Sequence, residues 1–174
     1  MKQILTALRL GALLLVLAPL PSAAQRAVAV LPGYATPFSL DSVAHARELA
    51  VPRPVAYRAL LDVLRQLQIP VDADSVHRSV AHAPFIKRGS IAKTAMSQLF
   101  DCGMGPMLPN ANTYRLKIAY AAWVDSLAPD RSRLRFGVGA GGEDVEGPSK
   151  EPVACASTGR FEKLLLDRVE AWLR

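Results

Sequence analysis

Residues 114–124 read YRLKIAYAAWV and residues 131–140 read RSRLRFGVGA, and these two stretches decide the fold. Apolar and polar residues alternate along both, which is typical of strands with one buried face and one wetter face. The residues expected on the buried face are Tyr114, Leu116, Ile118, Tyr120, Ala122 and Val124, then Leu134, Phe136, Val138 and Ala140. Residues 126–130, SLAPD, are expected to form the loop of this hairpin.

Two segments on either side of the hairpin are expected to be helices. Residues 54–68 place apolar side chains at three- and four-residue steps, begin at Pro54 and stop before Pro70. Residues 157–174 repeat this pattern, and a hydroxyl at the start can cap the first turn. Each helix needs an apolar surface, and the one-sided sheet supplies it. The sequence therefore predicts a single α+β domain, an antiparallel sheet with two main helices packed on its apolar face and the C-terminal helix closing the fold.

The predicted core follows from these two patterns. It consists of Tyr57, Leu60, Leu64, Leu116, Ile118, Tyr120, Leu134, Phe136, Val138, Phe161, Leu165, Val169 and Trp172. Solvent exposure of Leu116 or Phe136 would show that the predicted strand register is wrong.

The remaining segments carry weaker signals. Residues 25–44 are expected to form a flexible N-terminal leader ahead of the domain at 45–174, with a short strand at 27–31 as an alternative. Further expectations are a strand at 45–51 rather than a helix at 41–49, two short strands within 69–80 around a turn at 72–75, a short helix within 89–102, a loop at 103–112 and a turn-rich segment at 141–152.

Residues 1–24 have the parts of a secretory signal peptide. Lys2 and Arg9 provide the positive start, and GALLLVLAPL (11–20) is an apolar run too short to span a bilayer. Small residues then lead to a cleavage site before Gln25, so we expect export to the periplasm or the medium. An uncut anchor helix is the alternative. No second long apolar run follows, so the cleaved chain is not expected to span a membrane.

The chain is mildly basic, with a formal net charge of +6 that removal of Lys2 and Arg9 would reduce to +4. This balance favours an envelope protein or an anionic surface as the partner. Nucleic acid is not expected, because the sequence has no basic run interleaved with aromatic residues.

Cys102 and Cys155 are the only cysteines. In an exported chain they are expected to form a disulfide, which would enclose the whole hairpin. Two cysteines alone make a poor metal site, and no Cys-x-x-Cys is present, so a metal site and a catalytic thiol are less favoured alternatives. A bridge requires the two Cα atoms to lie about 4.4–6.8 Å apart.

The outward face of the hairpin gathers positive charge around a tryptophan. We expect Trp123 to face Arg133 across the two strands, where the guanidinium can stack on the indole ring. Tryptophan and arginine side by side recur in interface hot spots. The candidate interaction face is Trp123, Arg133, Arg135, Lys117 and Arg115. The alternative is a solvated face whose arginines keep the sheet from aggregating.

The sequence assigns no catalytic residue, metal ligand or cofactor site. Glycines within 137–142 match the letters of a dinucleotide fingerprint, but carboxylates follow where a helix should begin. His45, His77 and His82 lack the spacing of metal ligands, and Ser157 lacks a nucleophile elbow. An enzyme is therefore the least favoured class.

Two short boxes carry a resemblance. FDCG (100–103) and CASTGRFE (155–162) resemble the D-C-G box and the C-x-S-T-G-x-hydrophobic-E box of uncharacterised exported bacterial proteins, and LQIPV (67–71) also fits. The resemblance covers most of the mature chain and implies no activity. The element order also resembles helix-grip and outer-membrane-assembly accessory domains, in which an apolar cavity can lie between sheet and helix.

Two functions are therefore expected from the sequence. The first is an exported, non-enzymatic module that binds a macromolecule or associates with the envelope. The alternative is a carrier of a small apolar ligand with a pocket between the sheet and the C-terminal helix.

Overall fold

A computed structural model describes residues 27–74, 79–87, 89–105, 108–145 and 151–174, with the backbone alone at residue 74 and at 79–84. The expected signal peptide lies outside these residues. The elements in chain order are β1 (Val28–Ala29), β2 (Phe38–Ser39), the 3-10 helix η1 (Asp41–Val43), β3 (His45–Leu49), α1 (Arg53–Gln66), β4 (Ala73–Asp74), β5 (Ser79–Lys87), β6 (Ser90–Ile91), β7 (Thr94–Ala95), α2 (Met96–Leu99), β8 (Phe100–Asp101), α3 (Asn110–Thr113), β9 (Arg115–Ala128), β10 (Arg131–Glu143), β11 (Val153–Ser157) and α4 (Arg160–Trp172).

The hairpin of β9 and β10 is the centre of the fold. Among the described residues the sheet has seven antiparallel strands in the order β4-β5-β9-β10-β11-β8, and β3 also pairs with β10. The predicted loop at 126–130 was too long, because β9 continues to Ala128 and only two residues separate the strands. Ala128 pairs with Arg131 and Ser126 with Ser132, so Leu127 is the extra residue of a bulge.

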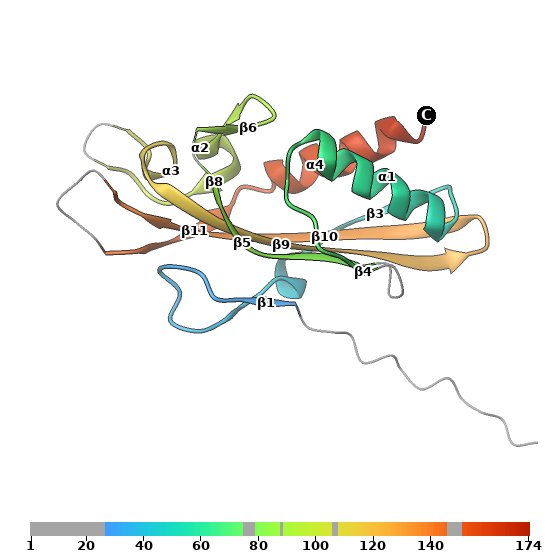
Figure 1. The fold of residues 1–174 in the computed structure, drawn as a ribbon, viewed down its shortest axis with the longest axis horizontal. Helices are drawn as coiled ribbons and strands as arrows, with labels where there is room; N and C mark the ends of the chain where they lie inside the picture. Colours follow the sequence, from blue (N-terminus) through green and yellow to red (C-terminus); the bar gives the residue numbers. More distant parts are fainter. Residues whose placement is uncertain (1–26, 75–78, 88, 106–107, 146–150) are drawn as a thin grey trace, which may run out of the picture.

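Helices α1 and α4 lie side by side on one face of the sheet, here called the helix face (Figure 1). The predicted α+β arrangement is confirmed. Four aromatic rings connect the layers: Tyr120 stacks on Phe136, Phe136 meets Phe161 edge-on, and Phe161 meets Phe100. These four side chains are fully buried, so they supply much of the apolar area that holds the helices on the sheet.

The predicted core is confirmed except at its last member. Twelve of its residues are buried, but the side chain of Trp172 is 40% exposed. The reason is the spacing of the residues that face the core at the end of α4. After the buried Val169, Leu173 packs against the core, so Trp172 turns toward solvent.

The second face of the sheet is covered by residues 27–44, here called the N-terminal strap (Figure 1). Leu31 and Leu40 are buried in a small cluster with Ala119 and Ala121 of β9. We expected a flexible leader here, and the described part instead packs on the domain. The physical reason is that a row of small residues leaves room for backbone on this face of the hairpin.

Alternate residues of β10 provide that room. A Cβ atom added at Gly137 would lie 2.1 Å from the carbonyl oxygen of Leu40, and one at Gly141 would lie 2.2 Å from that of Pro32. At Gly139 the added atom would lie 2.5 Å from the ring of Phe38. Glycine is therefore required by the close approach of the N-terminal strap, and the dinucleotide-like letters have a packing explanation.

Several short elements differ from the prediction. The strand expected at 45–51 is present as β3 but ends at Leu49, and the expected turn at 72–75 is partly occupied by β4. Residues 90–95 form the small hairpin β6–β7 in place of the first part of an expected helix. Strand β11 was not predicted, because its pattern is too short to separate from the turn-rich segment before it.

Candidate functional site

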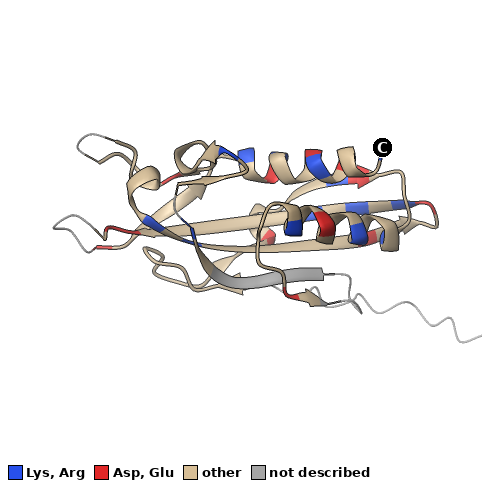
Figure 2. Cartoon of the chain, turned by 45° about the horizontal axis from the view of Figure 1, so that its top comes forward, with Lys and Arg blue, Asp and Glu red and all other residues tan. Residues whose placement is uncertain are grey.

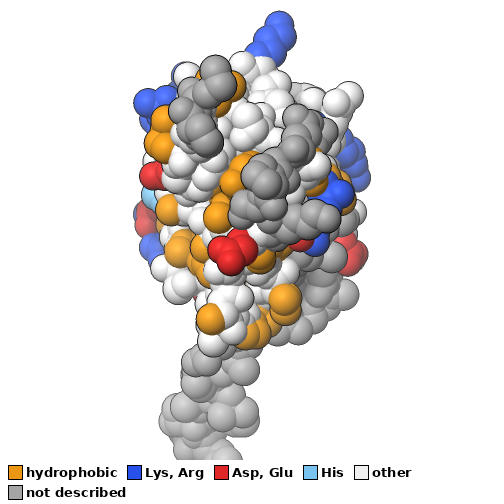
Figure 3. Space-filling view, turned by 90° about the vertical axis from the view of Figure 1, so that its left-hand side faces the viewer, with side chains coloured by type: hydrophobic (Ala, Val, Ile, Leu, Met, Phe, Trp, Pro, Cys, Tyr) orange, Lys and Arg blue, Asp and Glu red, His pale blue; other side chains and the backbone are white. Residues whose placement is uncertain are grey.

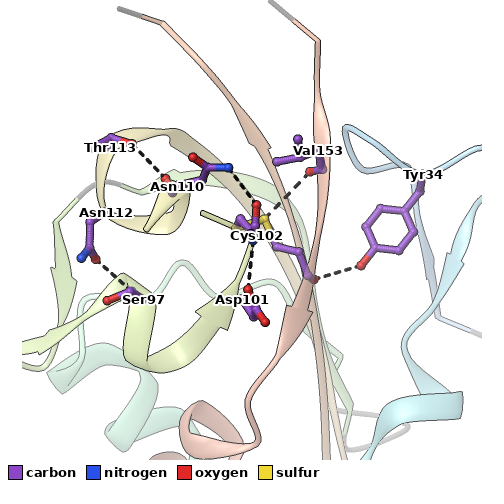
Figure 4. Close-up of a disulfide and its surroundings, with 10 residues drawn as sticks. Tyr34, Ser97, Asp101, Cys102, Asn110, Asn112, Thr113 and Val153 are labelled. Atoms are coloured by element: carbon purple, nitrogen blue, oxygen red, sulfur yellow. Dashed lines mark hydrogen bonds between the residues drawn. A yellow bond between two sulfur atoms is a disulfide. The ribbon is translucent and has the colours of Figure 1, made fainter. Parts of the chain in front are cut away.

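The disulfide joins the two boxes that the sequence singled out (Figure 4). Cys102 and Cys155 are bonded, which confirms the predicted pair, and their Cα atoms lie 4.2 Å apart, slightly below the expected window of about 4.4–6.8 Å. Asp101 pairs with Ala156 as β8 meets β11, and the Thr158 hydroxyl donates to the Gln98 carbonyl at 2.6 Å. The chain segment before β9 is thereby fixed to the segment that begins α4.

A tight loop follows Cys102 at this end of the molecule. The Gly103 N–H donates to Asp101 Oδ1 at 2.9 Å, and Gly103 has the left-handed φ of 78° that suits glycine. The Asn110 amide donates to the Cys102 carbonyl at 3.1 Å, and the Asn110 backbone N–H donates to the Gly103 carbonyl at 3.0 Å. Both ends of the loop are therefore held by hydrogen bonds beside the disulfide (Figure 4).

This loop presents apolar side chains to solvent. Met104 is 73% exposed and Leu108 is 55% exposed, although a backbone bridge joins Met104 to Pro109. Exposed Val145 lies at the same end, because it closely follows Glu143, which pairs with Arg115 at the start of β9, directly after α3. Figure 3 looks at this end and shows hydrophobic side chains around a few acidic ones. We call Met104, Leu108 and Val145 the apolar tip.

The start of α4 accounts for the second box. Gly159 is the N-cap, with a left-handed φ of 78°. The Ser157 hydroxyl accepts from the Gly159 N–H at 3.1 Å and donates to Glu162 Oε2 at 2.8 Å. A hydroxyl was expected to cap this helix, and the hydroxyl that does so belongs to Ser157, two residues before the N-cap. Phe161, in the first turn of α4, is buried in the core.

The candidate interaction face has a different register from the predicted one. Trp123 pairs with Arg135 and not with Arg133, because the shorter turn shifts the pairing by two residues. The guanidinium carbon of Arg135 lies 4.8 Å from the centre of the Trp123 ring, so a cation–π contact is present with the other arginine. Arg133 instead lies opposite Asp125.

The basic side chains of this face are paired with carboxylates. Glu48 on β3 accepts from Arg131 and Arg133, both at 2.9 Å, and Asp125 accepts from Arg135 at 2.9 Å. Hydrogen bonds from Arg133 and then Arg131 lower the pKa of Glu48. Figure 2 shows basic and acidic positions interspersed along the strands and helices. The face therefore offers little unbalanced charge to a partner.

Arg115 and Lys117 form a separate group around Glu143. Both donate to its carboxylate at 2.9 Å, and these bonds, from Lys117 first, lower the pKa of Glu143. The N-terminal strap covers Ala119 and Ala121, which lie between this group and Trp123 along β9. The five predicted residues thus share one face of the sheet, and the strap divides them into two groups.

A cavity of about 420 Å³ lies beside β10, at the edge along which both β3 and β11 pair with it. Strand β3 pairs with β10 as far as Phe136, and β11 pairs with it from Ala140, so no described strand lies across from residues 137–139. We call this gap the notch. Leu165 and Val169 of α4 are buried against the sheet, and the residue of α4 that lines the cavity is Glu162 in its first turn.

Of the three histidines, only His45 has a described side chain. His45 begins β3 and lines the cavity, His77 lies outside the described residues, and only the backbone of His82 is described. Within the described residues, no three His, Cys, Asp or Glu side chains gather as metal ligands.

Sequence reasoning missed the apolar tip and the cavity. GMGPMLP (103–109) was assigned only as a loop, although its methionines, leucine and prolines are unusually apolar for a solvated turn. The spacing of Gly137, Gly139 and Gly141 at every second position was the signal for a covered face.

No protein-family model matches this chain, and no curated protein shows significant similarity to it. In the part of the chain that the structure describes, no helix combines the length and the apolar character needed to cross a membrane.

Proposed function

We propose that this chain is an exported, non-enzymatic binding protein of the periplasm or the medium, and that the apolar tip is its recognition surface. The expected partner is an envelope protein with an apolar groove. The disulfide fits an oxidising compartment outside the cytoplasm.

One observation carries this proposal. Met104 and Leu108 are largely exposed on a loop whose ends are tied by the disulfide and by the Asn110 hydrogen bonds. Apolar side chains close to such fixed points lose less conformational entropy on binding than they would on a free chain end, so they contribute more to affinity. The Trp123 surface is the weaker candidate, because its arginines already bind carboxylates of the same chain.

Capture from an envelope extract tests the proposal. The mature protein is compared with the double variant Met104→Thr/Leu108→Thr, with Trp123→Ala, and with Leu127→Thr. Leu127 is the matched control because its side chain is 38% exposed and lies at the opposite end of β9 from Arg115, where the strand leaves the tip. We expect a partner that is retained by the Leu127 and Trp123 variants and lost by the tip variant. Retention of every partner by the folded tip variant would contradict the proposal.

A second function is supported by the cavity at the notch. Its volume of about 420 Å³ lies within the range of small-ligand pockets, and Val43 and Val138 give it an apolar lining. The chain would then carry a small ligand whose body is mainly apolar. Substituting Val43 with Phe should fill the cavity and abolish ligand binding, while the apolar tip stays unchanged.

A further inference from the structure

The cavity is bordered by backbone atoms of β10 as well as by side chains. In an antiparallel strand, successive residues turn their N–H and C=O groups to opposite sides. At least one residue of 137–139 therefore points these groups into the notch between β3 and β11. The cavity combines this backbone edge with side chains from the N-terminal strap and from α4.

One wall of the cavity is aromatic. Tyr34 and Phe38 both line it, and their ring centres lie 5.0 Å apart. The Tyr34 hydroxyl donates to the Cys155 carbonyl at 3.0 Å, which holds this ring to β11. Figure 4 shows the tyrosine reaching from the strap to that strand. The wall is therefore held to β11, and it places two aromatic rings at the cavity; a ring face attracts an organic cation.

The other end of the cavity is acidic. Glu162 lines it from the first turn of α4, and its side chain is only 1% exposed. Its Oε2 accepts from the Ser157 hydroxyl, and the helix N-terminus also favours a carboxylate there. Those two features explain why a glutamate is tolerated. They do not account for its placement at the wall of an open cavity. Among the described residues, no lysine or arginine lines this cavity, and His45 is the one basic residue that does.

We infer that this cavity binds a small organic cation, with an aromatic or branched apolar body against Tyr34 and Phe38 and an ammonium group toward Glu162. The charge of the ligand follows from the carboxyl group, and the apolar body follows from the rings and from Val43 and Val138. This inference names the ligand class for the small-ligand function proposed above and rests on that function.

Three probes of the same shape and different charge test the inference. Tryptamine carries an ammonium group, tryptophol a neutral hydroxyl and indole-3-acetate a carboxylate. Calorimetric titration of the whole chain should give saturable binding of tryptamine, about tenfold tighter than that of tryptophol, because a charge-assisted hydrogen bond replaces a neutral one. Indole-3-acetate should bind more weakly than both.

Two variants assign the effect to Glu162. Glu162→Gln keeps the size of the side chain and an oxygen for Ser157, and it should reduce tryptamine binding to the level of tryptophol. Glu170→Gln makes the same charge change on an exposed part of α4 and should change nothing. Where Glu162→Gln does not fold, the order of the three probes on the wild type tests the charge of the ligand, and Val43→Phe, which should weaken binding of all three, tests that they occupy this cavity.

Each outcome decides one of the two claims. Equal binding of the three probes, or tryptamine binding that Glu162→Gln leaves unchanged, would overturn the cationic ligand class and leave the carrier function standing. No saturable binding of any probe up to about 10 mM would overturn both. Binding that survives Val43→Phe would show that the probes occupy another place.

Discussion

Replacing Gly137 by alanine is the sharpest test of the N-terminal strap. Gly137 lies in the middle of β10, where alanine has an ordinary backbone conformation and would be tolerated by an open strand. The new methyl carbon would lie 2.1 Å from the carbonyl oxygen of Leu40 and 3.0 Å from its carbonyl carbon. Because these are backbone atoms, no rotamer change relieves the overlap, and the strap must move away from the sheet.

The cost follows from what the strap buries. Leu31 and Leu40 are 3% and 2% exposed and lie against small residues of β9. Exposing both would cost about 2 kcal/mol each, so the free energy of unfolding should fall by about 4 kcal/mol when the strap detaches. The helix face of the sheet should stay packed, because the nearest atoms to the new methyl group belong to Leu40 and Ala44 of the strap, on the other face.

Urea unfolding measures the loss of stability, and tryptophan emission reports the strap. Trp123 packs against the strap cluster, so its emission should shift to the red when the strap leaves. A Trp172→Phe background removes the second tryptophan. The matched control is Gly142→Ala, whose methyl group would meet only side chains at 3.1–3.3 Å, so that it should cost about 1 kcal/mol and leave the Trp123 emission unchanged.

A Gly137→Ala protein with wild-type stability and unshifted Trp123 emission would refute the reasoning. Limited digestion with chymotrypsin provides a second measurement, since detachment of the strap should expose the chain to cleavage after Tyr34 and Phe38. Equal protection of both bonds in the variant and in the wild type would show that the strap remains in place.

Four further predictions follow from other contacts. Cys155→Ala should lower the free energy of unfolding by up to about 4 kcal/mol, the chain-entropy value for this loop, and chemical reduction of the wild type should match it. Phe136→Ala should cost about 3–5 kcal/mol in the same denaturation assay, because its ring is fully buried among other rings. Lys93→Gly should raise the melting temperature, since Lys93 has a φ of 66° in the β6–β7 turn and relief of that strain is worth about 1 kcal/mol. The lowered pKa of Glu143, due first to Lys117, stabilises the fold above the unfolded-state pKa of about 4.3, so the stability difference between wild type and Glu143→Gln should be present at neutral pH and vanish as the pH falls below that value.

The amphipathic periods predicted the layers of this protein correctly. The alternation in 114–124 and 131–140 identified the buried face of the hairpin, and the helical stripes identified which residues of α1 and α4 meet it. Such patterns can be read from the sequence because burial acts on each residue through its own side chain. The disulfide was also predictable, because a chain with two cysteines allows a single pairing within itself.

The exposure of Trp172 and the register of the hairpin could not be predicted from these patterns. Whether Trp172 or Leu173 completes the core depends on the angle at which α4 crosses the sheet, which no local pattern contains. The pairing of Trp123 with Arg135 depends on a two-residue turn and a bulge, so an error of two residues in the loop moves every cross-strand partner.

The sequence by itself determined the fold class, the disulfide and the faces of the central strands, because each depends on residue type and local spacing. Only the tertiary structure decided that the N-terminal strap belongs to the domain, that β3 and β11 share one edge of β10, and that Glu162 lines the cavity between them. These are contacts between segments distant in the chain, and their energy exists only once backbone from one segment fits the space left by glycines and alanines of another.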